Sequence, residues 1–168
     1  MNEYNDYVSI TRRWLKEYNT FKATVASMTA DIKTQEEMLE RAMDLGAPIA
    51  MYDNMPKGGS GELTTVERQA QERMRRRESI ERAKLNRDEI QRIIDRVDRA
   101  VSSLDAEEQE LLLGFYIHGR SWQSLGYEHH YSERWARKKG GEALKSVAFA
   151  IFGIKARPQQ LSFVFAEW

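Results

Sequence analysis

Residues 121–144 read SWQSLGYEHHYSERWARKKGGEAL and contain the signals for two helices separated by a short turn. Leu125 and Gly126 supply an apolar side chain and a small residue where two crossing helices would meet. Tyr131 is expected to tuck its ring under the second helix, and Ser132 follows as the N-cap of that helix. The stretch therefore predicts a helix-turn-helix, although an ordinary helical hairpin in a bundle would need the same caps and spacing.

The second helix is expected to bury one side and to expose a charged stripe on the other. Between residues 132 and 145 there are five basic and two acidic residues, although the formal net charge of the chain is 0. Arg suits bidentate contact with guanine and Lys suits phosphate, so the stripe predicts contact with double-stranded DNA. With Ala136, Ala143 and Leu144 facing inward, helical geometry turns the charged residues of the first turns outward. Gln123 and Ser132 are expected to hold the DNA backbone. The expected DNA-binding set is therefore Gln123, Ser132, Glu133, Arg134, Arg137 and Lys138.

These residues resemble the last DNA-binding region, region four, of bacterial sigma factors. In that family a similar run ends in Ser, several charged residues and an Ala-Leu pair, which here are Ser132, residues 133–138 and Ala143-Leu144. With its helical arm, a loop at residues 52–56 followed by glycines, and a charged helix, the chain is also similar to RinA/ArpU-type phage regulators. The resemblance implies a regulator, expected to be an activator, of phage or prophage late genes that acts beside RNA polymerase in the bacterial cytoplasm.

Five positions depart from the pattern of such motifs. His130 stands at the turn position where Gly is common, His129 replaces an apolar residue, and Lys139 falls near a position that is usually buried. Gly140 and Gly141 lie inside the second helix, where each costs about 1 kcal/mol relative to Ala. They predict a bend or early fraying of that helix.

Two long helices are predicted before the helix-turn-helix, over residues 1–45 and 64–104. From Trp14 to Ala42 apolar residues recur at alternating spacings of four and three, broken only by Gln35, which is typical of a coiled-coil arm. The two helices can fold on each other as an antiparallel hairpin or pair with another protomer. We expect a homodimer, because many helix-turn-helix proteins read two half-sites with two-fold symmetry.

Residues 105–157 are predicted to form the compact helix-turn-helix domain. Asp105 is a good N-cap for a helix from Ala106 to His118, and Gly119 is expected to end it. The remaining segments are a flexible loop at residues 46–63 and a hydrophobic tail at residues 158–168, which is expected to form a short strand or a docked arm. The fold class is therefore all-α: a long helical hairpin or coiled-coil arm plus a C-terminal domain of sigma region-four type.

The sequence gives no sign of an enzyme or of a cofactor. The Gly58–Gly61 cluster lacks the Lys-Ser/Thr ending of a nucleotide-binding loop, and the motifs of metalloproteases and serine hydrolases are missing. With no Cys and only three His, a familiar zinc site is not expected, and turn positions near phosphate are the preferred roles of His129 and His130. No apolar run approaches the roughly 20 residues that span a bilayer, so we expect no membrane partner.

Two further features have competing interpretations. The basic run at residues 73–77 either grips phosphates or forms a solvated helix face, and the acidic neighbours Glu72, Glu78 and Glu81 favour the second. Trp14, Trp122 and Trp135 are expected to anchor the core rather than to stack on bases.

The sequence thus leads to a primary hypothesis with two alternatives. The primary hypothesis is a sequence-specific DNA-binding transcription regulator that reads promoter DNA with the helix after Ser132. One alternative is a small terminase-like subunit for DNA packaging, which also combines a helix-turn-helix with oligomerising helices. The other is a structural coiled-coil adaptor without affinity for DNA.

Overall fold

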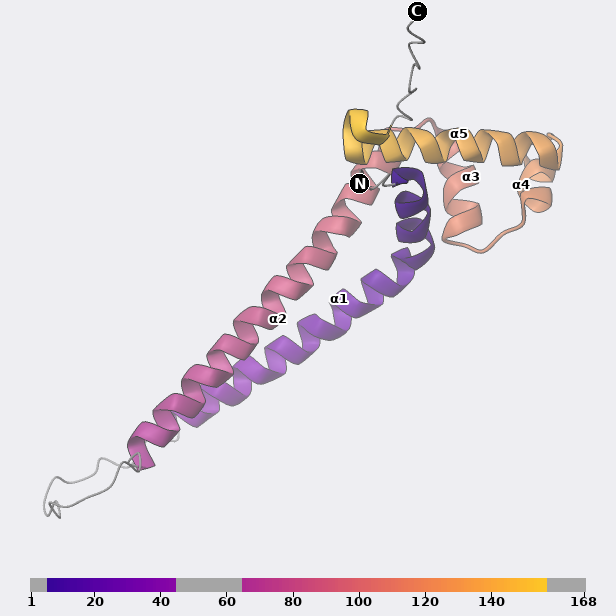
Figure 1. Cartoon of the computed structure of the whole chain (residues 1–168). Coiled ribbons are helices and arrows are strands. Elements are labelled where there is room, and N and C mark those ends of the chain that lie inside the picture. The colour runs from indigo at the N-terminus through magenta and orange to yellow at the C-terminus, as the bar shows by residue number, and fades with distance from the viewer. Residues whose placement is uncertain (1–5, 45–64, 157–168) are drawn as a thin grey trace, which may run out of the picture. The chain divides into compact units, whose positions relative to one another are not determined.

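The structure is a computed structural model, and it describes residues 6–44 and 65–156 (Figure 1). Every regular element within these two ranges is a helix, which confirms the all-α fold class. The loop at 46–63 and the tail at 158–168 lie outside the described residues. The helices are α1 (Tyr7–Asp44), α2 (Thr65–Ser102), α3 (Ala106–Tyr116), α4 (Trp122–Glu128), α5 (Glu133–Phe152) and a short 3-10 helix, η1 (Gly153–Ala156).

The described residues form two compact units. The helix-turn-helix unit contains residues 6–22 and 92–156, and the arm unit contains residues 23–44 and 65–91. The boundaries of these two units fall inside α1 and α2. The first turns of α1 and the last turns of α2 belong with the C-terminal helices.

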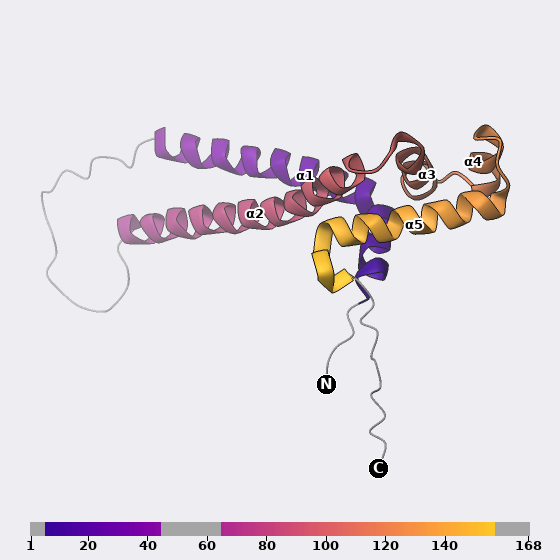
Figure 2. The same ribbon diagram turned by 90° about the horizontal axis from the view of Figure 1, so that it is seen from above.

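The first turns of α1 lie beside α5 within the helix-turn-helix unit, as Figures 1 and 2 both show. The rings of Tyr7 and Trp14 contact the ring of Phe152, with centroids 4.7 and 5.4 Å apart. Leu15 and Thr11 are completely buried, and the Thr11 hydroxyl donates to the carbonyl of Tyr7 at 2.8 Å. That hydrogen bond offsets the cost of burying a hydroxyl, which would otherwise be unfavourable.

Polar contacts join the same part of α1 to its neighbours. The hydroxyl of Tyr18 donates to Oδ1 of Asp98 on α2 at 2.5 Å, and the amide of Asn19 donates to the carbonyl of Ile117 after α3 at 3.1 Å. Burial, followed by the bond to Asp98, raises the pKa of Tyr18 above its ordinary value. Val97 is buried on the adjoining turn of α2. These contacts hold the last turns of α2, which precede α3, against the first turns of α1.

In the arm unit, α1 and α2 pair within one chain as an antiparallel hairpin. Ile32 and Leu39 of α1 form a buried cluster with Ile80 of α2, against which Ala83 packs. Ile32 and Leu39 belong to the apolar seam predicted between Trp14 and Ala42. For this segment the chain shows the first of the two predicted arrangements, the hairpin within one chain.

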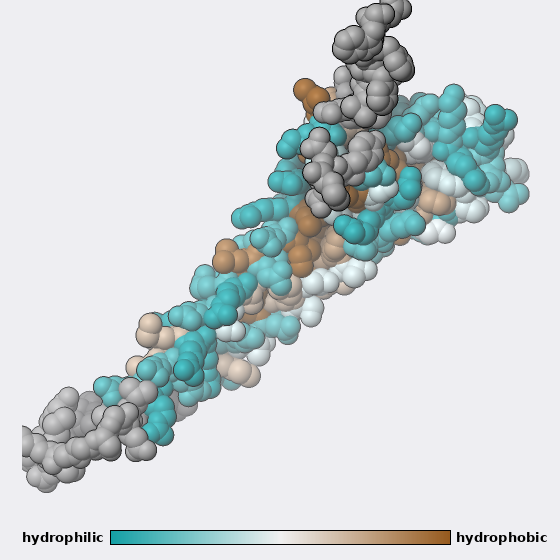
Figure 3. All heavy atoms as spheres, in the orientation of Figure 1, coloured by the Kyte–Doolittle hydropathy of each residue, from teal (hydrophilic) through white to brown (hydrophobic). Residues whose placement is uncertain are grey.

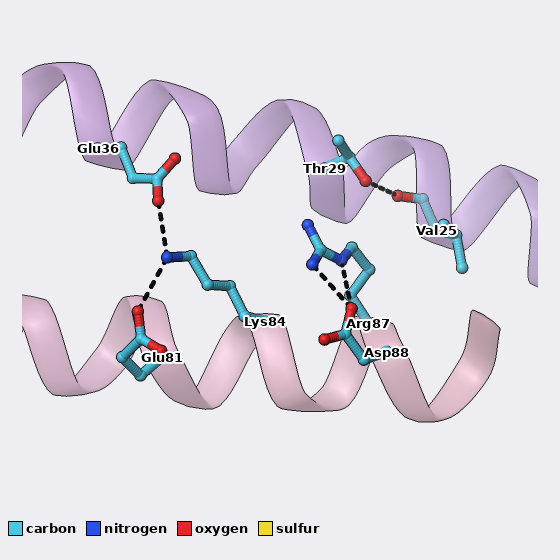
Figure 4. A network of polar contacts seen from close by, with 7 residues as sticks. All are labelled: Val25, Thr29, Glu36, Glu81, Lys84, Arg87 and Asp88. Carbon is cyan, nitrogen blue, oxygen red and sulfur yellow. Dashed lines mark hydrogen bonds and ion pairs between the residues drawn. The ribbon is translucent and has the colours of Figure 1, made fainter. Parts of the chain in front are cut away.

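Charged side chains flank this narrow apolar seam (Figure 4). The Lys84 ammonium lies 2.9 Å from a carboxylate oxygen of Glu36 on α1 and 2.9 Å from one of Glu81 on its own helix. The hydrogen bond to Glu36 is the main cause that raises the pKa of Lys84. Figure 3 shows hydrophilic residues over most of the visible face of the arm unit. A seam this narrow depends on such flanking side chains to exclude water.

The expected bend or fraying at Gly140 and Gly141 is wrong, because α5 continues without interruption from Glu133 to Phe152. Gly140 is buried against Trp122, so its missing side chain makes room for a neighbour and does not loosen the helix. The favourable packing there outweighs the low helix propensity of glycine.

The boundaries of α3 follow local signals closely. The carboxylate of Asp105 accepts from the backbone N–H of Glu108 at 2.8 Å, which confirms the predicted N-cap. The helix ends at Tyr116, two residues before the predicted His118, because the chain reverses at Gly119 with φ +65°. The positive φ explains the glycine at that position.

Candidate nucleic-acid interface

Side-chain caps start both helices of the helix-turn-helix. The hydroxyl of Ser121 accepts from the N–H of Ser124 at 3.1 Å at the start of α4. The hydroxyl of Ser132 accepts from the N–H of Trp135 at 3.2 Å at the start of α5. Each bond satisfies a backbone donor that a helix end leaves free. The predicted caps are therefore confirmed, and they set the points at which the two helices begin.

The turn between α4 and α5 is closed by a residue with a left-handed backbone. His130 has φ +59°, and the N–H of Tyr131 then donates to the carbonyl of Gly126 at 2.8 Å. Histidine is among the few non-glycine residues enriched in this conformation. A Cβ on Gly126 would lie 2.9 Å from the carbonyl oxygen of Tyr131, which confirms Gly126 as the close-approach site.

An apolar cluster packs between α3, α4 and α5. Leu111 of α3, Leu125 of α4 and Ala136 of α5 are completely buried and contact one another. The rings of Phe115 and Trp122 stack beside them with centroids 4.0 Å apart. This cluster joins three helices, so it holds the start of α5 at a fixed angle to α4.

Tyr131 does not tuck under α5, contrary to the expectation from the sequence. Its side chain is 45% exposed, and its ring stacks on that of Trp135 with centroids 3.6 Å apart. Stacking on Trp135 and a hydroxyl that favours water keep the ring at the surface. Trp14, Trp122 and Trp135 are all partly buried against other rings or the core, which confirms them as packing residues.

The six residues expected to contact DNA all lie at the surface, at the start of α4 or at the start and on the first turns of α5. None of them is buried within the helix-turn-helix unit. Ala136, Ala143 and Leu144 are buried on the opposite side of α5, as predicted. The exposed residues are Gln123, Ser132, Glu133, Arg134, Arg137 and Lys138.

The cations of this stripe differ in their partners. Arg137 forms an exposed ion pair with Glu133 at 2.6 Å, and Lys138 lies 4.0 Å from Glu142. Arg134 has no ion pair or side-chain hydrogen bond within the described residues. Exposed i, i+4 pairs are worth only a few tenths of a kcal/mol (about 0.3–0.5), so they can exchange readily for a stronger anion. The guanidinium of Arg134 needs no such exchange, since residues 6–44 and 65–156 offer it no anionic partner.

One side of the helix-turn-helix faces carboxylates of α3. The Lys139 ammonium lies 3.4 Å from Oε1 of Glu108, and this hydrogen bond is the main cause that raises the pKa of Lys139. His129 faces the same acidic helix, with Nε2 3.5 Å from Oε2 of Glu110 and Nδ1 4.0 Å from Oε1 of Glu107. The idea that His129 lies near phosphate is not supported, because carboxylates surround its ring. This flank faces α3 and is unsuited to DNA.

A salt bridge stabilises the end of α4. Arg120 pairs with Glu128, and its backbone N–H donates to the carbonyl of Gly114 at 2.9 Å. The hydrogen bond from Arg120 is the main cause that lowers the pKa of Glu128, and the same bond raises the pKa of Arg120. The pair ties the loop after α3 to the turn before α5.

The other flank of α5 borders an open cleft of about 320 Å³ within the helix-turn-helix unit. Its cations are Arg12 and Lys16 of α1 and Arg137 and Lys145 of α5. The sequence contains the pair on α1 at i, i+4 spacing, but only the packing of α1 against α5 brings that pair to the interface. The cleft is lined by Val8, Arg12, Lys16, Phe115, Tyr116, Trp122, Arg137, Gly141, Leu144 and Lys145.

The basic run at residues 73–77 lies on α2 in the arm unit. Arg76 pairs with Glu72, and Arg73 donates to the carbonyl of Ala42 on α1 at 3.4 Å. These contacts within the hairpin agree with the interpretation as a solvated helix face. The run is not part of the candidate interface.

Comparisons with known proteins add no functional information to this description. Comparison of the chain with protein-family models, with curated proteins and with solved structures found no match. None of the helices in residues 6–44 and 65–156 combines the length and the apolar character needed to cross a membrane. Any functional assignment therefore depends on the interface itself.

Proposed function

We propose that the protein is a sequence-specific DNA-binding regulator of transcription that inserts the start of α5 into the major groove. The observation that carries this proposal is the exposed cationic stripe at the start of a helix whose angle is set by a tight, capped turn. Among the described residues Arg134 has no ion pair, and the pairs of Arg137 and Lys138 are exposed and can exchange for a phosphate. A major groove about 12 Å wide admits one helix with its side chains.

The partners of each cation assign different roles along the stripe. Arg134 lies exposed in the first turn of α5 and has no ion pair in the part of the chain that the structure describes, so it is the best candidate for bidentate contact with a guanine. Lys138 follows one turn later and suits a phosphate, because its ammonium is a point charge. Gln123, exposed at the start of α4, suits a contact with the DNA backbone.

The finer biological role follows from the resemblance to sigma region four and to RinA/ArpU-type regulators. By that resemblance the protein acts on phage or prophage late promoters in the bacterial cytoplasm, as an activator beside RNA polymerase. A homodimer would present two copies of α5 to two half-sites. In such a dimer the hairpin of α1 and α2 within each chain would keep its buried cluster of Ile32, Leu39 and Ile80.

The test is selection of bound sites from a random DNA pool, followed by fluorescence anisotropy at several salt concentrations. The affinity of the full chain should fall steeply as salt rises. Arg134→Ala should reduce discrimination against a single mismatched base pair by about 1–3 kcal/mol. Lys155→Ala is the control, since that lysine is exposed on η1, outside the stripe.

Two outcomes would contradict the proposal. One is the absence of salt-dependent DNA binding, which an adaptor without affinity for DNA would show. The other is unchanged discrimination in both Arg134→Ala and Arg137→Ala. Light scattering adds a separate measurement: a closed ring of many subunits would argue for a packaging subunit, and a dimer would argue for a regulator.

A further inference from the structure

The cleft beside α5 has an unbalanced charge. Its rim carries Arg12, Lys16, Arg137 and Lys145, and none of the described residues that line it is acidic; Arg137 alone pairs with a carboxylate, that of Glu133 beside the cleft. Within the described residues Arg12, Lys16 and Lys145 form no ion pair, and all three are exposed. Arg12 has a minor electrostatic effect on Asp6, whose carboxylate is already hydrogen-bonded to Ser9. Three cations without an ion pair among the described residues, together with the paired Arg137, favour an anionic ligand in this cleft.

The floor of the cleft is apolar. The stacked rings of Phe115 and Trp122 contribute to it, together with the side chains of Val8 and Leu144. A ligand that fits must therefore carry anionic groups at the rim and less polar groups between them. A nucleic-acid strand has this composition, because its phosphates alternate with deoxyribose rings.

The cleft is continuous with the stripe that we assign to DNA. Arg137 belongs to both surfaces. Along α5, Arg134, Lys138, Gly141 and Lys145 follow at i, i+4, i+7 and i+11, a spacing that places them on one line of a helix. A duplex that receives the start of α5 in its groove has a phosphate strand beside that line.

Gly141 provides an independent observation at the centre of this surface. A Cβ added to Gly141 would meet nothing within 4 Å, whereas one added to Gly140 would strike Trp122. The fold therefore has a packing reason for Gly140 but none for Gly141. A helix-interior glycine lowers helix stability relative to alanine, and a common reason to keep one is close approach by the backbone of a ligand.

We propose that this cleft holds one sugar-phosphate strand of the bound DNA. Arg12, Lys16 and Lys145 contact successive phosphates, and Gly141 allows the strand to approach α5 closely. The inference rests on the proposed function and adds to it a second contact surface, supplied by α1. It gives the first turns of α1 a role in affinity and in docking angle, and no role in reading bases.

The first test compares Arg12→Ala/Lys16→Ala with Arg13→Ala in the full chain. Arg13 is the matched control, since it is an exposed arginine on the same turn of α1 that does not line the cleft. The double variant should bind selected and random duplexes more weakly by the same factor. The slope of log affinity against log salt should fall by about 2, close to 0.9 for each phosphate that is no longer bound. Arg13→Ala should leave affinity and slope unchanged.

The second test uses Gly141→Ala, which should have opposite effects on stability and binding. The melting temperature should rise, because alanine favours the helix and the added methyl group meets no neighbour. Affinity for both kinds of duplex should fall several-fold. A variant that is stabilised but binds as well as the parent would overturn the role of Gly141, as would a lower melting temperature.

The outcomes separate this inference from the proposed function. If the parent binds DNA and Arg134→Ala lowers discrimination, but the double variant keeps its full salt slope, only the cleft assignment is wrong. If the parent shows no salt-dependent binding, both proposals fail. A short polyglutamate peptide that binds the parent, but not a double variant with normal DNA affinity, would reassign the cleft to an acidic protein segment.

Discussion

The indole of Trp122 occupies the space that a side chain at Gly140 would need. A Cβ on Gly140 would lie 2.3 Å from Cη2 and 2.5 Å from Cζ3 of Trp122. Cβ atoms do not approach carbon atoms this closely, so α5 passes α4 at this distance only because residue 140 lacks a side chain. The packing of Trp122 on Gly140 joins the first residue of α4 to the middle of α5 and so fixes their crossing.

Gly140→Ala should therefore destabilise the protein, although alanine is the better helix former. The clash should cost about 1–3 kcal/mol, as overpacking of a tight core does, less the roughly 1 kcal/mol that alanine contributes to the helix. Urea unfolding followed by circular dichroism measures the change. Gly141→Ala is the natural control, and a result in which both substitutions stabilise the protein equally would show that Trp122 moves aside.

Removal of the cap at Ser132 should weaken the start of α5. In Ser132→Ala the N–H of Trp135 has no side-chain acceptor, which typically costs about 1 kcal/mol. The free energy of unfolding from denaturant titration measures this cost. Ser132→Asp should restore most of it, because a carboxylate also accepts from the first turn and interacts favourably with the helix dipole. Equal stability of the alanine variant and the parent would contradict a capping role.

The salt bridge between Arg120 and Glu128 should make part of the free energy of unfolding depend on pH. Arg120 lowers the folded-state pKa of Glu128, so the contribution is present above the unfolded pKa and is lost as pH falls through the folded pKa. Melting temperatures measured from pH 7 downwards should show Glu128→Gln less stable than the parent at neutral pH. The difference should shrink in acid; a difference that stays constant would mean that the charge is not involved.

The arm hairpin should depend on its buried seam. Ile80→Ala removes a side chain that is 4% exposed and contacts Ile32 and Leu39, and the destabilisation should be about 2 kcal/mol, at the low end for core truncations because the seam is narrow. Leu85→Ala is the matched control, since Leu85 on the same helix is 63% exposed. Calorimetry measures both. If the two variants melted alike, the pairing of α1 with α2 would not contribute to stability.

Local signals in the amino-acid sequence were sufficient to place the helices around the turn. Asp105, Ser121 and Ser132 indicate helix starts because a side-chain oxygen can satisfy free N–H groups only at those positions. Gly119 indicates a reversal because glycine has a low cost at positive φ. The inward positions of α5 followed from the helical period, and so did the exposure of Arg134 and its neighbours. All of these signals act over a few residues.

Which of these elements meet was settled by packing between distant parts of the chain. The burial of Thr11, the exposure of Tyr131 and the space for Trp122 at Gly140 depend on side chains from other helices. In the sequence Arg12 is one more solvated charge on a long helix, and only the packing of α1 against α5 places it at the cleft with Lys145. Periodicity shows which face of a helix is buried, but the partner of that face is selected by shape and by the contacts that several helices make together.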